Sequence, residues 1–336
     1  MNILITGAAG FLAGPTCREA LHRWPRARVF RSDLRPEPGI RPCDLLEPES
    51  ARRLVAASRP DLVFHLAGMA RSADPGTLWR AHVTTTINLM EALQALRTRT
   101  RVVLSGSSAE YGAARGVVTE RTPPDPVTDY GRSKHCQTLA ALSFRHEGLE
   151  VLIARIFNVA GPGTPEWLAP GAFAGQIADI ARKGGSGRPL SHQRRSGTPA
   201  PETPGSGRPL SHQRRSGTPA PETPGSGRVL TGNLAAERDY LDVRDAAAAL
   251  AAIARHGRDG EVYNVCSGRT IAMADLLQKM IAASGRRISV VRDPARWRPV
   301  DVRRLAGSQS KLTTLCGWKP SIPLEESLAA TLRSRL

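Results

Sequence analysis

Aromatic residues are scarce in this sequence, making up 4% of its 336 residues. Cysteine is scarce as well: five are present, an odd number with no Cys-x-x-Cys spacing, namely Cys17, Cys43, Cys136, Cys266 and Cys316. This pattern argues against disulfides and structural zinc and predicts reduced thiols in a cytoplasm. No apolar run could span a membrane, and a strand-like start leaves no room for a signal peptide. We therefore expect a cytoplasmic protein with no metal site and no membrane partner.

The charge is one-sided: 47 Lys and Arg stand against 30 Asp and Glu, giving a net charge of +17. Such an excess is typical of nucleic-acid binding. The few aromatics are poor material for base stacking, however, and the basic residues are spread along the chain. An arginine-rich composition and a preference for anionic small ligands explain the charge, so we expect no nucleic-acid partner.

Strand-like apolar runs alternate with helical patterns throughout the first half. The expected strands are residues 2–6, 27–32, 61–67, 101–105 and 150–155, and the expected helices are residues 11–24, 47–58, 77–96 and 130–146. This alternation predicts the α/β class, with a Rossmann-type, doubly wound parallel sheet that helices cover on both faces.

The second half is less regular and predicts a smaller, mixed α/β C-terminal domain that binds substrate. Helices are expected at residues 171–183, 244–256, 272–284 and 324–332, and short strands at 261–265 and 288–291. We assign residues 1–160 to a dinucleotide-binding Rossmann domain, to which residues 236–260 return. Residues 161–183 and 229–336 form the substrate domain.

A tandem repeat separates the two parts of that domain, at residues 184–228. A 20-residue unit begins at Gly185, recurs letter for letter from Gly205, and starts a third time at Gly225. The unit is rich in Pro, Gly and Ser and nearly free of apolar residues, so burial cannot offset the entropy of ordering it. We expect a disordered insertion that proteases cut first. Either a recent duplication or an error in the gene sequence explains the perfect copy. The repeat contains several arginines, so binding of an acidic partner is a further possibility.

A glycine-rich turn follows the first expected strand and indicates a dinucleotide site. Gly7 permits a sharp turn, and Gly10 lets backbone N–H groups approach a pyrophosphate at the start of the next helix. The expected contacts in this turn are Gly7, Gly10, Phe11 and Leu12.

Asp33 ends the second expected strand, where a carboxylate can accept both ribose hydroxyls and repel a 2′-phosphate. It therefore favours NAD(H). Arg31 and Arg35 flank it and soften this rejection, so NADP(H) stays open.

Further cofactor contacts are expected from two loops. Asp44 and Leu45 are placed at the adenine edge, although a turn-capping role explains Asp44 equally well. The backbone of Leu66, Ala67 and Gly68 closes the next strand beside the cofactor path.

The reacting groups are predicted from a Tyr-x-x-x-Lys pair preceded by a serine cluster. Tyr130 and Lys134 fall on one face of a helix, and Ser107 lies in Ser105-Gly-Ser-Ser108. A free tyrosine has a pKa of about 10, and a nearby ammonium lowers it toward neutrality. Tyr130 can then exchange a proton with a carbonyl or alcohol oxygen that Ser107 holds, while hydride moves to or from a nicotinamide. Lys134 also suits the nicotinamide ribose.

Taken in order, these motifs resemble the extended short-chain dehydrogenase/reductase family, the NAD-dependent epimerases and dehydratases of nucleotide sugars. The resemblance covers the chain apart from the repeat. Segments 262–268, 293–299 and 317–320 resemble most the GDP-6-deoxy-D-mannose reductase group of that family.

The resemblance implies further roles, in its substrate site and its assembly. Asn158 corresponds to an asparagine that contacts the sugar or its phosphate, and Arg238 and Arg298 to arginines that clasp the diphosphate. Asp301 corresponds to a ligand of a substrate hydroxyl, and Ser108 adjoins Ser107 in the same site. Homodimers of the family pair the helices expected at 77–96 and 130–146 in a four-helix bundle.

Two departures from the family pattern matter. An asparagine is usual where Ala81-His82-Val83 stands, so His82 either replaces it in a proton relay or is simply packed. Sugar 4,6-dehydratases carry an Asp-Glu pair directly after the serine, where this chain has Ser108 and Ala109. Glu110 comes one residue late and, on an alternating strand end, would point away. Elimination therefore lacks its acid and base.

The sequence thus predicts an NAD(P)H-dependent reductase of a GDP-linked 4-keto-6-deoxymannose that makes GDP-D-rhamnose. A sugar C4 epimerase with the same residues is the first alternative. A non-catalytic nucleotide-binding sensor or scaffold is the second, and the intact Ser/Tyr/Lys set speaks against it.

Overall fold

The computed structural model describes residues 1–336 except 115, 146–147, 184–226 and 298–301. The insertion predicted at 184–228 lies outside the described residues, apart from its last two positions. In the described part, no helix is both long and apolar enough to cross a membrane.

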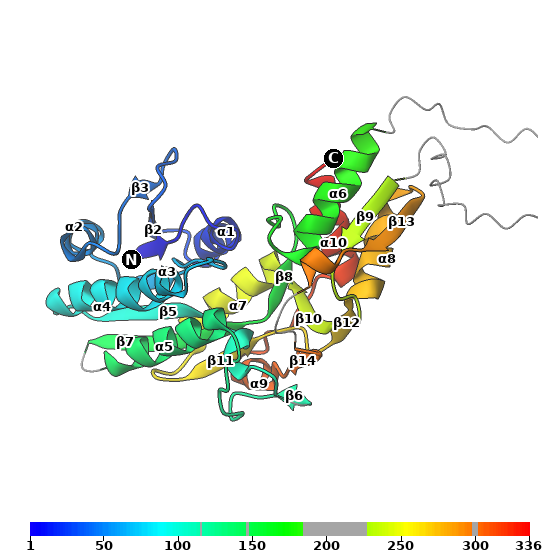
Figure 1. The fold of residues 1–336 in the computed structure, drawn as a ribbon. Helices are drawn as coiled ribbons and strands as arrows, with labels where there is room; N and C mark the ends of the chain where they lie inside the picture. Colours follow the sequence, from blue (N-terminus) through cyan, green and yellow to red (C-terminus); the bar gives the residue numbers. More distant parts are fainter. Residues whose placement is uncertain (115, 146–147, 184–226, 298–301) are drawn as a thin grey trace, which may run out of the picture.

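A seven-stranded parallel sheet forms the larger half (Figure 1). Its strands are β1 (Asn2–Thr6), β2 (Arg28–Asp33), β3 (Arg41–Pro42), β4 (Leu62–His65), β5 (Thr100–Ser107), β7 (Leu149–Ile156) and β11 (Val262–Val265). Their order in the sheet is β11-β7-β5-β4-β1-β2-β3, and all neighbours are parallel. Because the chain winds outward in both directions from β1 and β4, the predicted doubly wound, Rossmann-type sheet is confirmed.

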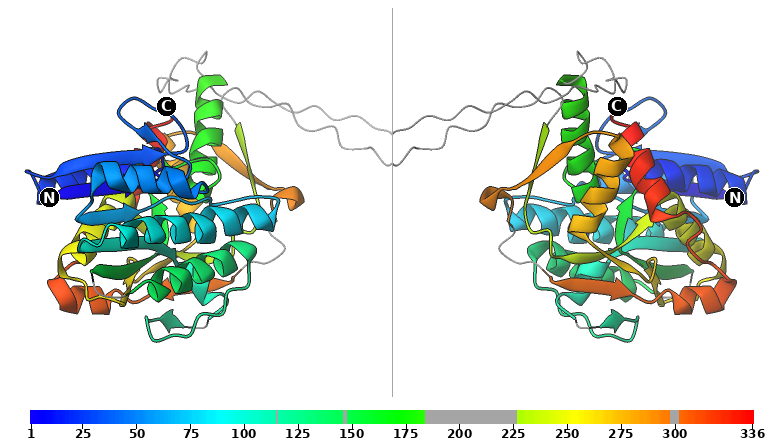
Figure 2. Two further views of the ribbon diagram at one scale, coloured as in Figure 1. Left: turned by 90° about the vertical axis from the view of Figure 1, so that its left-hand side faces the viewer. Right: turned by 90° about the vertical axis from the view of Figure 1, so that its right-hand side faces the viewer.

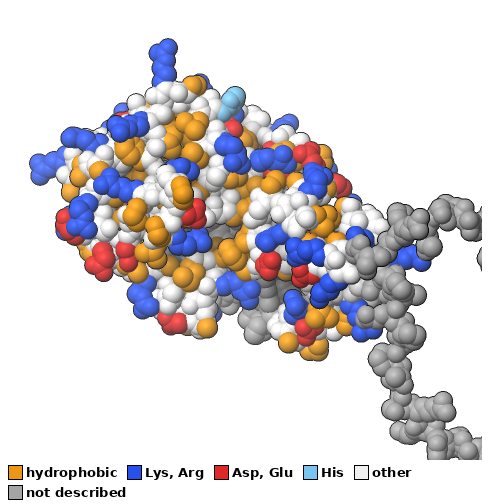
Figure 3. Space-filling model, turned by 90° about the horizontal axis from the view of Figure 1, so that it is seen from above, with side chains coloured by type: hydrophobic (Ala, Val, Ile, Leu, Met, Phe, Trp, Pro, Cys, Tyr) orange, Lys and Arg blue, Asp and Glu red, His pale blue; other side chains and the backbone are white. Residues whose placement is uncertain are grey.

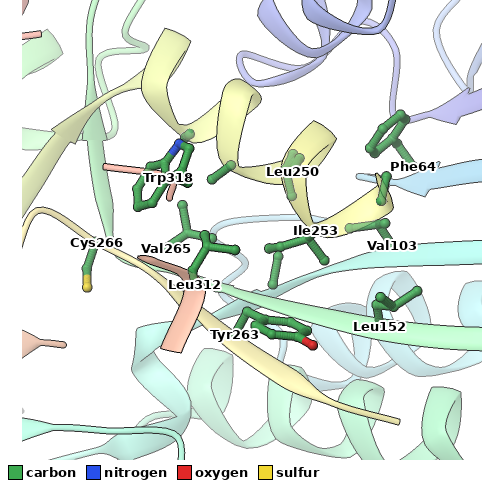
Figure 4. Close-up of a cluster of buried hydrophobic side chains, with 14 of the residues drawn as sticks. Phe64, Val103, Leu152, Leu250, Ile253, Tyr263, Val265, Cys266, Leu312 and Trp318 are labelled. Carbon is green, nitrogen blue, oxygen red and sulfur yellow. The ribbon is translucent and has the colours of Figure 1, made fainter. Parts of the chain in front are cut away.

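Helices cover both faces of this sheet. Helices α1 (Ala13–Arg23) and α7 (Val243–His256) share one apolar cluster with it, while α2 (Pro48–Ser58), α4 (Thr85–Ala95) and α5 (Asp129–Ser143) share the other. Successive strand residues point to opposite faces, so Ile3 and Ile5 join the first cluster and Leu4 the second. Figure 4 shows Leu250 and Ile253 of α7 lying over the strands in the first cluster.

The smaller half is mixed, as predicted. Its five-stranded sheet contains β6 (Val117–Val118), β8 (Asn158–Ala160), β10 (Glu237–Asp242), β12 (Thr270–Ala272) and β14 (Arg304–Gly307), and a separate parallel pair joins β9 (Gly227–Thr231) to β13 (Ile288–Arg292). Helices α6 (Ala169–Lys183), α8 (Met273–Ser284) and α10 (Leu324–Arg333) pack together around a third apolar cluster. Figure 2 shows α6 rising beside β9, away from the larger sheet.

The helix predicted at 77–96 is not continuous. It consists of α3 (Pro75–Trp79), a π-helical segment η1 (Arg80–Thr84) and α4, with the N–H of Thr85 bonded to the carbonyl of Arg80, five residues back. The Oγ1 atoms of Thr85 and Thr86 donate to the carbonyls of Ala81 and His82 at 2.7 Å. Such threonine bonds compete with the backbone ladder and fit the wider turn at this point.

The remaining elements are short. They are 3₁₀ turns η2 (Ser108–Tyr111) and η3 (Pro294–Arg296) and helix α9 (Ser310–Cys316), which packs on the larger half through Leu312.

Candidate active site

The glycine turn after β1 fits closely against the loop after β4. Gly7 has a positive φ of +69°, and a Cβ placed on it would lie 2.6 Å from the backbone nitrogen of Ala67. Only glycine therefore suits this position. The N–H of Gly10 donates to the carbonyl of Gly7 at 2.9 Å. Helix α1 begins at Ala13 rather than at the predicted residue 11, because Phe11 and Leu12 still belong to the turn.

Asp33 stands at the end of β2 and is bonded to the glycine turn. Its Oδ2 accepts from the N–H of Ala9 at 3.0 Å, and its Oδ1 accepts from the N–H of Arg35 at 3.0 Å. The Arg35 guanidinium lies 3.8 Å from the same carboxylate and also donates to the carbonyl of Ala9. The Asp33 carboxylate, which is predicted to bind the ribose, is thus fixed beside the glycine turn, with the Arg35 guanidinium next to it.

Asp44 and Leu45 follow β3 on the same side of the sheet. Asp44 Oδ1 accepts from the N–H of Leu46 at 2.9 Å, which is the turn-capping arrangement. Leu45 is buried, and its carbonyl accepts from Asn88 of α4. Their contact with adenine stays a prediction.

Ser107 is the last residue of β5 and meets Tyr130, which lies in the first turn of α5. The two side chains lie close enough for the Ser107 hydroxyl to lower the pKa of the Tyr130 phenol. The expected strand 101–105 extends to Ser107, and Thr128 caps α5 by accepting from the N–H of Gly131 at 3.0 Å. The structure therefore brings together two of the three predicted catalytic groups. Ser108 adjoins them and is 8% exposed.

Lys134 lies one turn further along α5 and is almost fully buried. Its Nζ donates to the carbonyl of Ser105 at 2.5 Å and to Oε1 of Gln137 at 2.6 Å. Gln137 in turn donates to Thr86 at 2.9 Å, and Thr86 Oγ1 lies 2.9 Å from Nε2 of His65. Burial lowers the pKa of Lys134 to about 8. Sequence reasoning missed Gln137, although its i+3 spacing from Lys134 was a usable signal.

The predicted lowering of the Tyr130 pKa is not what the structure shows. Burial raises the pKa of Tyr130 above its ordinary value, the nearby Ser107 side chain lowers it by less, and the charge of Glu110 adds to the increase. Because Lys134 points its ammonium at Ser105 and Gln137, it does not offset this burial. Tyr130 is accordingly a protonated phenol at neutral pH, which is the form that can donate a proton.

Glu110 lies in η2. The sequence argument had placed it on an alternating strand end, which is wrong. Its side chain is fully buried; Oε1 accepts from the N–H of Ser107 at 2.8 Å, and Oε2 lies 3.0 Å from Nη2 of Arg155. Burial raises the pKa of Glu110, but His135 at 3.7 Å and the Arg155 charge lower it by more. The carboxylate is therefore ionised and engaged beneath Ser107, so it cannot serve as an acid or base beside the substrate.

Two further predicted substrate residues, Asn158 and Arg238, lie on the smaller half. Asn158 on β8 donates to the carbonyl of Asp239 at 3.1 Å, and Arg238 on β10 donates to the carbonyl of Glu237 at 2.9 Å. Strands β8 and β10 are paired, so these two side chains come from neighbouring strands. Arg298 and Asp301 lie outside the described residues.

Comparison with known proteins places the chain. The NAD dependent epimerase/dehydratase family matches residues 3–195, and the GDP-mannose 4,6 dehydratase family matches residues 223–331. The chain belongs to the NAD-dependent epimerase/dehydratase family. The family predicted from the motifs is thereby confirmed.

Members with different activities resemble the chain. It is 30% identical over 297 residues to the GDP-6-deoxy-D-mannose reductase of Pseudomonas aeruginosa, covering 86% of this chain and 84% of that protein. It is 25% identical over 349 residues to a UDP-glucose 4-epimerase of Rhizobium leguminosarum, covering 97% of this chain and 94% of that protein. The solved structure of RMD from Pseudomonas aeruginosa, complexed with NADPH, superposes with a TM-score of 0.77 at 27% identity, covering 100% of this chain and 99% of that one.

The residues of the glycine turn fit a dinucleotide, as expected for this family. The close approach of Gly7 to Ala67 leaves no room there for a side chain, and Asp33 is held at the end of β2. Gly7, Gly10 and the start of α1 would receive the pyrophosphate, and Asp33 the adenosine ribose. The chain is thus an NAD(P)-dependent enzyme of this family.

The net positive charge does not gather in one stripe on the face seen in Figure 3. Lys and Arg are scattered over both halves there and alternate with Asp and Glu. The absence of a nucleic-acid partner remains a prediction.

Proposed function

We propose that this enzyme reduces the C4 ketone of GDP-4-keto-6-deoxymannose to the alcohol, giving GDP-D-rhamnose. The observation that carries the proposal is the placement of Ser107, at the end of β5, beside Tyr130, with the buried Nζ of Lys134 one turn further along α5. The 30% identity with a GDP-6-deoxy-D-mannose reductase supports the same assignment. Arg238 and Asn158 are proposed to hold the diphosphate and the sugar, together with Arg298 and Asp301.

The proposed chemistry needs one proton and one hydride. NAD(P)H, when bound, supplies the hydride that reaches C4. The hydroxyl of Ser107 hydrogen-bonds the ketone oxygen, and Tyr130 transfers its phenolic proton to that oxygen as the C=O π bond becomes a C–H and an O–H bond. The resulting phenolate regains its proton from solvent. Lys134, fixed by Ser105 and Gln137, is proposed to contact the nicotinamide ribose.

A dehydratase function is disfavoured by the same site, although dehydratases occur among the chain's relatives. Elimination needs a carboxylate beside the sugar, and the position after Ser108 is Ala109. The carboxylate of Glu110 is occupied by Arg155 and by the N–H of Ser107.

An epimerase uses the same three residues twice and is the second candidate, which the UDP-glucose 4-epimerase relative supports. The two functions differ in cofactor consumption. Mixed with GDP-4-keto-6-deoxymannose and NAD(P)H, a reductase oxidises one cofactor per sugar, measured by the loss of absorbance at the nicotinamide band. Interconversion of a nucleotide sugar carrying a C4 hydroxyl with its C4 epimer, without net cofactor loss, would instead establish the epimerase.

Tyr130→Phe is the matched control for this assay. It removes the proton donor and keeps the ring, so kcat should fall by about 10²–10⁴-fold, while cofactor binding is retained. Full activity of Tyr130→Phe in either assay would contradict the role given to Tyr130, whereas intact cellular function of an inactive Tyr130→Phe variant would favour the scaffold.

We propose NAD(H) as the preferred cofactor, because the carboxylate of Asp33 is fixed where a 2′-phosphate would meet it. We also propose a cytoplasmic homodimer formed through α4 and α5. These two helices contact each other, and Leu139 of α5 leaves 54% of its surface exposed.

A further inference from the structure

His82 lies inside the π-helical segment η1 and is 1% exposed. Single π-helical turns are rare and occur frequently at functional sites. This one separates α3 from α4, directly behind the predicted cofactor loop 66–68. The chain therefore departs from a regular helix at the residue that the sequence resemblance sets against an asparagine.

Both ring nitrogens of His82 have partners that fix one tautomer. Nε2 accepts from the N–H of Met69 at 3.1 Å, so Nε2 carries no proton. Nδ1 lies 2.9 Å from Oγ of Ser133, and that hydroxyl donates its only hydrogen to the carbonyl of Tyr130 at 2.9 Å. Nδ1 must then be the donor to Ser133. Burial, followed by the charge of Lys134, lowers the pKa of His82 to about 3, so the ring is neutral.

The ring also makes two close packing contacts. It meets the ring of Tyr130 edge to face, with centroids 5.6 Å apart and planes at 77°. It also lies against the backbone of Gly68, where an added Cβ would be 2.9 Å from Cδ2 of His82. One side chain thus joins the loop after β4, at Gly68 and Met69, to the first turn of α5 that carries Tyr130.

We propose that His82 is a positioning residue that sets where the Tyr130 hydroxyl lies relative to the cofactor loop, and that it is not a proton relay. A relay would need a ring nitrogen that can take up a proton, and protonation at Nε2 would break the bond to Met69. The inference rests on the proposed role of Tyr130. We call the three contacts of His82 together the clamp: its bond to Ser133, its bond to Met69 and its ring contact with Tyr130.

Two substitutions separate the parts of this clamp. His82→Phe keeps a ring against Tyr130 but loses both hydrogen bonds, whereas His82→Asn keeps a donor near the Nδ1 position for Ser133 and loses the bond to Met69. A displacement of the order of 1 Å can cost about 10²-fold in rate. We therefore expect kcat to fall by about 10- to 100-fold in His82→Phe and by less in His82→Asn, with KM little changed in both.

Thr100→Val is the control for lost stability alone. Thr100 is buried at the opposite end of β5, and its Oγ1 donates to the carbonyl of Pro60 at 2.9 Å. This variant also removes a buried hydrogen bond from the same sheet, but its kcat should equal that of the parent. If Thr100→Val lost as much kcat as His82→Phe, general destabilisation would account for both and the clamp would be refuted.

Long-range ¹H–¹⁵N spectra of the imidazoles give a readout independent of activity. The imidazole signal that is missing from the spectrum of His82→Phe belongs to His82. This ring should keep the Nδ1–H tautomer from pH 5 to 9. A ring that titrates in this range, or a pH profile of kcat that loses a limb near pH 6–7 in His82→Phe, would establish the relay instead. Full kcat in His82→Phe with inactive Tyr130→Phe would overturn this inference alone; full kcat in both would overturn the proposed function.

Discussion

The buried ion pair between Glu110 and Arg155 allows a test of whether Glu110 stabilises the fold or takes part in the reaction. Glu110 is 0% and Arg155 4% exposed, and the carboxylate also accepts from Ser107 and from Thr138. In Glu110→Gln the amide fills the same space, but the Arg155 guanidinium loses its counter-charge. Removal of one partner of a buried pair costs about 3–5 kcal/mol. For a domain of this size, that corresponds to a fall in Tm on the order of 10 °C.

The catalytic consequence should be small by comparison. The amide oxygen that Glu110→Gln introduces can still accept from the N–H of Ser107, so at low temperature kcat should stay within about tenfold of the parent, a change worth ~1.4 kcal/mol. Thermal unfolding followed by circular dichroism, together with the ketone reduction assay, measures both effects. The double variant Glu110→Gln, Arg155→Met removes both charges and should recover part of the lost stability, because apolar replacement of a buried pair is often neutral.

Two outcomes would refute this reasoning. An unchanged Tm in Glu110→Gln would mean that Arg155 does not depend on the carboxylate. Abolished activity at full stability would make Glu110 an acid or base of the reaction, and the case against dehydration would fail.

Two further predictions concern titration and cofactor choice. Burial lowers the pKa of Lys134 to about 8 in the folded protein, against 10.5 when exposed. Between these pH values the unfolded chain therefore binds more protons, so the contribution of Lys134 to the free energy of unfolding should rise by up to ~3 kcal/mol from pH 8 to 10.5. Urea titrations of a Lys134→Met variant should lack this rise. Asp33→Asn should raise the ratio of kcat/KM for NADPH over NADH by about tenfold, or ~1.4 kcal/mol, because Arg35 loses its carboxylate partner and becomes available to a 2′-phosphate. Arg35→Ala in that background should reverse the gain, and an unchanged ratio in Asp33→Asn would contradict the role given to its carboxylate.

The sequence was most informative where local pattern and tertiary structure agree. The alternation of strands and helices predicts the parallel sheet because each strand is buried on both faces, and Gly7 is readable because its positive φ excludes other residues. The pairing of Ser107 with Tyr130 followed from their places at a strand end and a helix start.

Other features depend on contacts that the sequence does not specify. The helix expected at 77–96 has the right composition throughout, and only the hydrogen bonds around Thr85 and Thr86 show the π segment. The acidity of Tyr130 was misjudged because the spacing to Lys134 does not show where the ammonium points. Short strands such as β6 and β14 were missed, since two to four residues carry too little periodicity.

The π segment also affects how this chain should be aligned with others. A π turn accommodates one residue more than an α turn, and each residue turns an α-helix by about 100°. A relative with a regular helix at 80–84 would place one residue fewer between α3 and the helix corresponding to α4. An alignment that ignores this difference would match His82 with a residue on another face of the helix. A one-residue gap near Ala81 would restore the correct match, so that the residues that relatives carry in place of His82 can be compared.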